Sequence, residues 1–148
     1  MNALELLKQD HQKVKKLLTS ATETEDKSEQ KRLSREIRTE LETHARIEET
    51  IFYPALKDAD ETRDITLEAF EEHKLVKTLL GELESLGKDK EEWTAKFTVL
   101  KENIEHHVEE EEDEMFPKAR KVLGEEGAET LGTRMEKAKG EQKAAAAS

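Results

Sequence analysis

The chain has 148 residues, with 36 acidic against 25 basic side chains, a formal net charge of −11 and no cysteine. This length suits one domain with its own core, and the charge would repel nucleic acid and anionic membrane surfaces, so neither partner is expected. Disulfides, thiolate metal ligands and thiol nucleophiles are excluded, and any metal must be held by nitrogen and oxygen.

The amino terminus, residues 1–8, meets charge too early for a secretory signal. No uninterrupted apolar run reaches the length that a membrane span needs. A cytoplasmic location is therefore expected. No catalytic triad, phosphate loop or nucleotide fingerprint occurs, so the sequence gives no support to a hydrolase or a kinase.

Apolar residues make up 34% of the chain and charged residues 41%, yet the apolar residues are not scattered. They recur at steps of three or four, which is the period of an amphipathic helix. Pro54 should kink or tighten the second helix near its end, and Gly124 should stop the fourth. The spacing predicts four long helices, over residues 3–22, 27–58, 62–86 and 90–122, and a short fifth over 126–138.

The connections between the long helices are short, so neighbouring helices should be antiparallel. The predicted fold is all-α, an up-down-up-down four-helix bundle with a short C-terminal helix. The bundle should occupy residues 1–139, and residues 140–148 are predicted to be a disordered tail.

Two helical segments carry a histidine and a glutamate four residues apart, His44-x-x-x-Glu48 and His107-x-x-x-Glu111. Side chains at this spacing project from one face of a helix and can reach one point, which suits metal ligands. Each pair is followed, ten residues after its histidine, by a proline that an aromatic residue precedes, in Phe52-Tyr53-Pro54 and Met115-Phe116-Pro117. The chain looks duplicated around these pairs.

Two further histidines, His11 and His73, lie on the apolar stripes of the first and third helices. Residues of an antiparallel hairpin stand at the same height when they are equally far from the turn. The midpoints between successive stripe histidines fall on the predicted turns at 26–28, 58–60 and 88–90. One histidine from each helix should therefore point inward at one level of the bundle.

A lone histidine on an apolar stripe is more often a hydrogen-bonded core residue than a ligand. Four imidazoles at one height, together with two carboxylates, favour the metal-ligand interpretation instead. Burying them without a compensating cation would cost on the order of several kcal/mol. We interpret the cluster as a metal site with the ligands His11, His44, Glu48, His73, His107 and Glu111.

Six nitrogen and oxygen ligands are too many for one tetrahedral zinc, and histidines disfavour calcium and magnesium. Two metal ions fit better, with two histidines for each, Glu48 and Glu111 bridging, and room for an oxo or hydroxo bridge and a small ligand. Iron is the natural candidate, with manganese and zinc as competitors. Candidate acceptors that orient the imidazoles are Asp10, Glu49, Glu72 and Glu112, and Tyr53 either packs or places its hydroxyl near the site.

The six ligand positions and the paired proline segments resemble the hemerythrin-like (HHE cation-binding) family over residues 3–122. The resemblance implies a non-haem di-iron site in a four-helix bundle that reacts with oxygen, peroxide or nitric oxide, or responds to iron. Oxygen-carrying hemerythrins have a second histidine on the third helix, four residues after the first, where this chain has Lys77. Their second acidic ligand follows its histidine at five residues, where this chain has Glu112.

These departures disfavour reversible oxygen storage and favour redox turnover, with catalase-like decomposition of peroxide as one activity. An iron or oxygen sensor and a metal-storage bundle without turnover stay open as alternatives. Lys77 is expected to be an outward, solvated ammonium, and His106 should lie on the surface because neighbours on a helix point about 100° apart. The expected partner is a small diatomic ligand or peroxide, and the chain is expected to be a monomer or a weak homo-oligomer.

Overall fold

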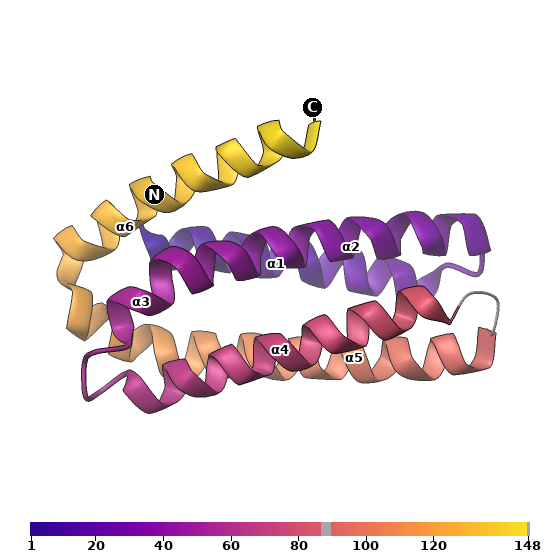
Figure 1. Cartoon of the computed structure of the whole chain (residues 1–148), viewed down its shortest axis with the longest axis horizontal. Helices are drawn as coiled ribbons and strands as arrows, with labels where there is room; N and C mark the ends of the chain where they lie inside the picture. The colour runs from indigo at the N-terminus through magenta and orange to yellow at the C-terminus, as the bar shows by residue number, and fades with distance from the viewer. Residues whose placement is uncertain (87–89, 148) are drawn as a thin grey trace.

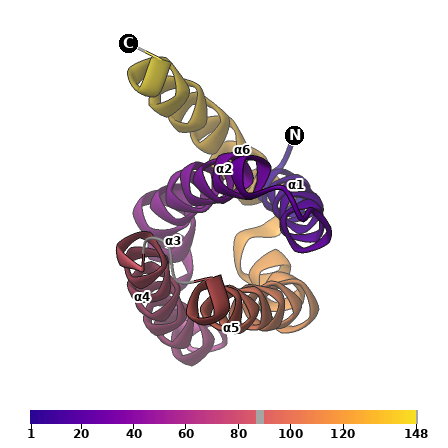
Figure 2. The same cartoon turned by 90° about the vertical axis from the view of Figure 1, so that its right-hand side faces the viewer.

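The computed structural model describes residues 1–86 and 90–147 as an all-α bundle, and no strand occurs among them. Four long helices run antiparallel to their neighbours (Figure 1) and surround a common axis (Figure 2). None of the described helices is long and apolar enough to cross a membrane. The elements are α1 (Ala3–Glu23), α2 (Lys27–Ile47), η1 (Glu48–Phe52), α3 (Tyr53–Leu56), α4 (Arg63–Ser85), α5 (Lys90–Glu110), η2 (Glu111–Met115) and α6 (Phe116–Ala147).

The first two helices begin at side-chain caps that the sequence provides. Asn2 accepts a hydrogen bond from the backbone N–H of Glu5, and Asp26 accepts from those of Ser28 and Glu29. Such caps satisfy N–H groups that have no partner within the helix. The turn at 58–60 lies between α3 and α4 as predicted. The first turn lies at residues 24–26, slightly earlier than the predicted 26–28, because Asp26 caps α2, which begins at Lys27. The turn predicted at 88–90 falls largely on residues 87–89, outside the described residues.

The prolines widen their helices. The prediction that Pro54 kinks or tightens the second helix is therefore wrong in its second alternative. Before Pro54 and Pro117 the chain forms the π-helical segments η1 and η2. A proline has no N–H to donate, and its ring clashes with the carbonyl four residues earlier. A local change to i→i+5 bonding relieves this clash, and the N–H of Tyr53 accordingly donates to the carbonyl of Glu48.

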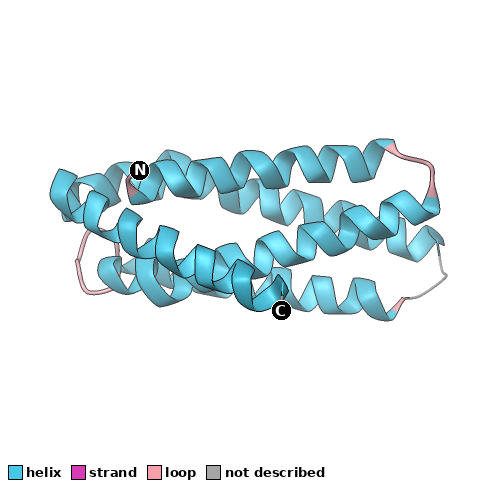
Figure 3. Cartoon of the chain, turned by 90° about the horizontal axis from the view of Figure 1, so that it is seen from above, coloured by secondary structure: helices cyan, strands magenta, loops and turns pink. Residues whose placement is uncertain are grey.

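The last helix departs most from the prediction. Gly124 breaks it with φ 69° and ψ 176°, a left-handed conformation that favours glycine. The chain then turns back across α1 and α2 on the outside of the bundle (Figures 2 and 3). Helix continues to Ala147, so the helix predicted over 126–138 is longer and the residues up to 147 are not a disordered tail. Alanine-rich sequence has a high helix propensity, which favours this continuation.

Two apolar clusters fill the bundle on either side of a polar layer. One cluster contains Leu7, Phe52 and Met115, and extends to Leu131 and Met135 of α6. The other occupies the opposite half and contains residues such as Leu18, Ile37 and Leu100. Along α1, α2 and α4 the stripe histidine lies between the residues of the two clusters. The histidine layer therefore lies between two clusters of buried apolar side chains.

Candidate metal centre

Each long helix contributes one histidine to the polar layer, and the four rings form two pairs. The ring centroids of His11 and His44 are 4.9 Å apart, and those of His73 and His107 are also 4.9 Å apart. The layer is formed because the four positions stand at one height in the antiparallel helices, as the turn midpoints predicted.

Glu48 and Glu111 lie between the two histidine pairs. Glu48 Oε1 is 3.1 Å from the Nε2 atoms of both His44 and His73. Glu111 Oε1 is 3.1 Å from His11 Nε2, and its Oε2 is 3.1 Å from His107 Nε2. Each carboxylate is therefore shared by both pairs. Two groups of potential ligands result, His11–His44–Glu48–Glu111 and Glu48–His73–His107–Glu111, each with its ligand atoms within 4.8 Å of one another.

Several of these ligand atoms are buried and make no hydrogen bond of good geometry, although some of them lie 3.1 Å from another candidate ligand atom. They are Nε2 of His11, Nε2 of His44, Oε2 of Glu48 and Oε1 of Glu111. In the described part of the chain, only Thr66 Oγ1 shares this condition. Unpaired buried polar atoms are costly and rare, and lone pairs that converge on one region suit a cation. The imidazole and carboxylate donors fit iron, manganese or zinc.

The outer nitrogen of every imidazole in the layer is held by a carboxylate. The Nδ1 atoms of His11, His44, His73 and His107 lie 2.6, 3.1, 2.8 and 2.6 Å from the carboxylate oxygens of Glu112, Asp10, Glu49 and Glu72, respectively. In a neutral imidazole, an Nδ1–H that donates outward fixes the ring and leaves the Nε2 lone pair directed inward. The four acceptors that the sequence predicted therefore all lie beside a candidate ligand.

Tyr53 reaches the layer because of the π turn. Tyr53 is at position i+5 relative to Glu48, and an i→i+5 turn brings residues at this spacing to one face. Its hydroxyl donates to Glu111 Oε2 at 2.6 Å and lies 3.2 Å from His73 Nε2. Burial raises the pKa of Tyr53 well above 10, and the negative charges of Glu111 and Glu48 raise it further. The hydroxyl therefore keeps its proton at physiological pH.

The charges of the layer are strongly coupled. Burial alone would lower the pKa of His44, but Glu48 and Asp10 outweigh it and raise that pKa to about 10. The pKa values of His73 and His107 are also raised, because neighbouring glutamates outweigh the cost of burial. Burial opposes ionisation of Glu48, but His44 and the other hydrogen-bonding groups around it hold its pKa well below the usual range. Without metal, imidazolium protons thus balance the buried carboxylates.

Metal binding is accordingly expected to release protons. A histidine whose pKa is raised on folding stabilises the metal-free fold fully below about pH 6.5, and this stabilisation is lost as the pH rises toward about 10 for His44. Metal requires neutral imidazole, so apparent metal affinity should rise over the same range. Calorimetric titration at pH 7 in buffers of different ionisation enthalpy should give different apparent enthalpies. Identical enthalpies in all buffers would contradict this charge assignment.

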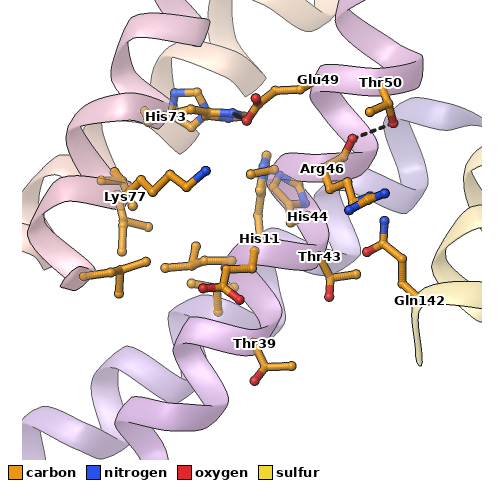
Figure 4. A pocket seen from close by; sticks show the side chains of 18 of the residues that line it. His11, Thr39, Thr43, His44, Arg46, Glu49, Thr50, His73, Lys77 and Gln142 are labelled. Carbon is orange, nitrogen blue, oxygen red and sulfur yellow. Dashed lines mark hydrogen bonds and ion pairs between the residues drawn. The ribbon is translucent and has the colours of Figure 1, made fainter. Parts of the chain in front are cut away.

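A cavity of about 1090 Å³ reaches the four histidines from the side of α2 and α4. Its walls include Val76, Leu80 and Ile104 of the bundle and Gln142 of α6. Figure 4 shows Lys77 extending from α4 toward the middle of the cavity. Lys77 is solvent-exposed, as expected, but its direction corrects the prediction that it points outward. The cavity connects the histidine layer to its surroundings.

His106 and Lys139 lie outside the histidine layer. His106 is on the surface as expected, with 71% of its side chain exposed, and its Nε2 is 3.2 Å from Glu110 Oε2. Lys139 of α6 donates a hydrogen bond to Asp10, the partner of His44. The contact of Lys139 could not be predicted from the sequence, because a lysine in a helix beyond the bundle carries no local signal of where it docks.

Fold and site together define an all-α bundle protein with a histidine and glutamate centre that is able to hold metal ions. The family model for the hemerythrin HHE cation binding domain matches residues 2–119. The chain therefore belongs to the hemerythrin HHE cation-binding domain family, which confirms the resemblance seen in the sequence.

Two individual proteins are also similar. The crystal structure of a hemerythrin HHE cation binding domain-containing protein from Mycobacterium kansasii superposes with a TM-score of 0.80 at 30% identity, covering 95% of this chain and 89% of that chain. A protein named DNA nickase, from Nostoc sp. (strain PCC 7120 / SAG 25.82 / UTEX 2576), is 27% identical over 139 residues. The match covers 94% of this chain but only 39% of that relative.

Proposed function

We propose that this protein is a non-haem di-iron protein that binds or reacts with oxygen, peroxide or nitric oxide, with catalase-like decomposition of peroxide as its activity. The observation that carries the proposal is the shared position of Glu48 and Glu111 between two histidine pairs. Two carboxylates that each face both pairs suit bridging ligands of a two-metal site. Bound iron would supply the redox chemistry.

The protein's own groups would hold the centre rigid and manage protons. The four carboxylates on the Nδ1 atoms fix the imidazole orientations and raise their donor strength. Tyr53 holds a proton on an oxygen 2.6 Å from Glu111 Oε2, inside the histidine layer. This hydroxyl is thus a hydrogen-bond donor beside the site where a small oxidant would react.

The cavity supports a small ligand that arrives from outside. Its apolar walls at Val76, Leu80 and Ile104 would admit uncharged oxygen or nitric oxide. The ammonium of Lys77, directed into the same cavity (Figure 4), would attract an anionic form of peroxide. Both ligand classes therefore have a physical route to the histidine layer.

The proposed function includes no nucleic-acid partner, although the Nostoc relative is named DNA nickase. The match covers only 39% of that protein, so its name can refer to an activity of the part that is not matched. A net charge of −11 also opposes binding to phosphate backbones.

The proposal is tested with the iron-loaded protein and hydrogen peroxide. We expect a ferric optical band that changes on addition of peroxide, together with release of oxygen. An iron sensor would instead lose most of its helicity on chelation and show negligible turnover, and a storage bundle would hold metal without redox change. A spectrum indifferent to both peroxide and nitric oxide would contradict the proposal.

A further inference from the structure

The returning part of α6 adds a charged contact to one corner of the histidine layer. Lys139 Nζ donates to Asp10 Oδ1, and Asp10 Oδ2 in turn accepts from His44 Nδ1–H at 3.1 Å. The Asp10 side chain is 5% exposed and that of Lys139 is 22% exposed. Lys139 also lies beyond residues 2–119, the range that the family model matches. A cation from outside the matched range thus contacts the carboxylate that accepts from a candidate ligand.

This contact distinguishes His44 from the other three histidines. The acceptors of His11, His73 and His107 are Glu112, Glu49 and Glu72. In residues 1–86 and 90–147, none of these three acceptors makes an ion pair with a lysine or an arginine. Within these described residues, Asp10 is the one acceptor of the four that pairs with a lysine, and it is also the most buried of them.

We propose that Lys139 is a positioning residue that lowers the metal affinity of the His11–His44 position independently of the His73–His107 position. A carboxylate that accepts from a ligand imidazole increases its donor strength. An ammonium on the other oxygen of that carboxylate draws its negative charge away, and it also repels a nearby cation. The inference rests on the proposed function, because it requires that both positions hold metal.

The consequence is a centre whose two positions respond differently to metal supply. Two hydrogen bonds, through Asp10, connect Lys139 to the imidazole of His44. Its charge therefore acts mainly on the His11–His44 position. The contact between Lys139 and Asp10 also holds α6 beside the histidine layer. Ala138 and Gln142 of the same helix line the cavity that reaches the histidines. Docking of α6 therefore tunes one half of the centre.

The experiment is an anaerobic titration of the metal-free full chain with Co²⁺, followed by absorption and calorimetry. Lys139→Met should tighten one of the two dissociation constants by about tenfold and leave the other unchanged. Lys139→Arg should bind as the wild type does, because it keeps the charge. Lys137→Met, an exposed change on the same helix, should leave both constants unchanged.

Two further variants assign the affected constant. Asp10→Asn removes the charge that accepts from His44 and should weaken the same constant by about 10–100-fold. Glu49→Gln, which removes the acceptor of His73, should weaken the other one. The opposite signs of Lys139→Met and Asp10→Asn separate an electrostatic role of Lys139 from a merely structural one, for which loss of Lys139 would weaken binding or leave it unchanged.

The outcomes separate this inference from the proposed function. A wild-type chain that binds fewer than two Co²⁺ ions contradicts the two-metal proposal itself. Two ions in the wild type, with constants that Lys139→Met leaves unchanged or weakens, overturn the role of Lys139 alone. Lys139→Met could also release α6 from the bundle, which limited proteolysis would detect. The ammonium is absent from Asp10 in that case too, so the same tightening is expected.

Discussion

Replacing Glu48 with glutamine should weaken the binding of both metal ions by more than about 100-fold each. Loss of a residue that only orients a ligand typically changes metal affinity by about 10–100-fold. Glu48 is fully buried, and its Oε1 lies 3.1 Å from the inner nitrogens of both His44 and His73. Because this carboxylate faces both pairs, one substitution should affect both ions.

The measurement is metal analysis after equilibrium dialysis of the iron-loaded variants. Glu109→Gln is the matched control, since it makes the same chemical change at an exposed position of α5, two residues from His107. Circular dichroism of the metal-free proteins checks that both variants remain helical. Loss of only one ion in Glu48→Gln would show that Glu48 serves a single position and would refute the bridging role.

Replacing Gly132 with alanine should lower the free energy of unfolding by about 1–3 kcal/mol, the usual cost of overpacking. A Cβ at this position would lie 2.3 Å from the carbonyl oxygen of Met1 and 2.8 Å from the backbone nitrogen of Ala3. These are backbone atoms, which cannot rotate away as a side chain can. α6 would have to move off the start of α1.

Gly81→Ala provides the control for this prediction. A Cβ at Gly81, inside α4, would meet nothing within 4 Å, so alanine should raise stability by about 0.5–1 kcal/mol through helix propensity. Chemical denaturation of the metal-free proteins measures both changes. Equal stabilisation by the two alanines would mean that α6 does not pack closely against the first residues of the chain.

The helices and the level of the histidines could be predicted because both depend on local periodicity. Apolar steps of three or four fix the inward face of each helix, and turn midpoints fix relative height because every helix rises by the same amount per residue. The carboxylates on the Nδ1 atoms could be proposed as well, since Asp10, Glu49, Glu72 and Glu112 each adjoin a stripe histidine or a stripe glutamate in the sequence.

The π turns and the path of α6 could not be predicted in the same way. A π turn changes helix phase without changing composition, and it decides whether Tyr53 faces Glu111 or turns away. The repeated prolines at 54 and 117 were the available signal. Lys139 is 129 residues from Asp10, and their contact depends on the direction that the chain takes after Gly124, which local pattern does not encode.

The most direct test of the two-metal centre is an anaerobic titration of the metal-free chain with Fe²⁺. The shared positions of Glu48 and Glu111 predict saturation at two ions per chain, with release of protons at pH 7 and with both ions lost in Glu48→Gln. Saturation at one ion, or two ions that persist in Glu48→Gln, would contradict a centre bridged by these carboxylates.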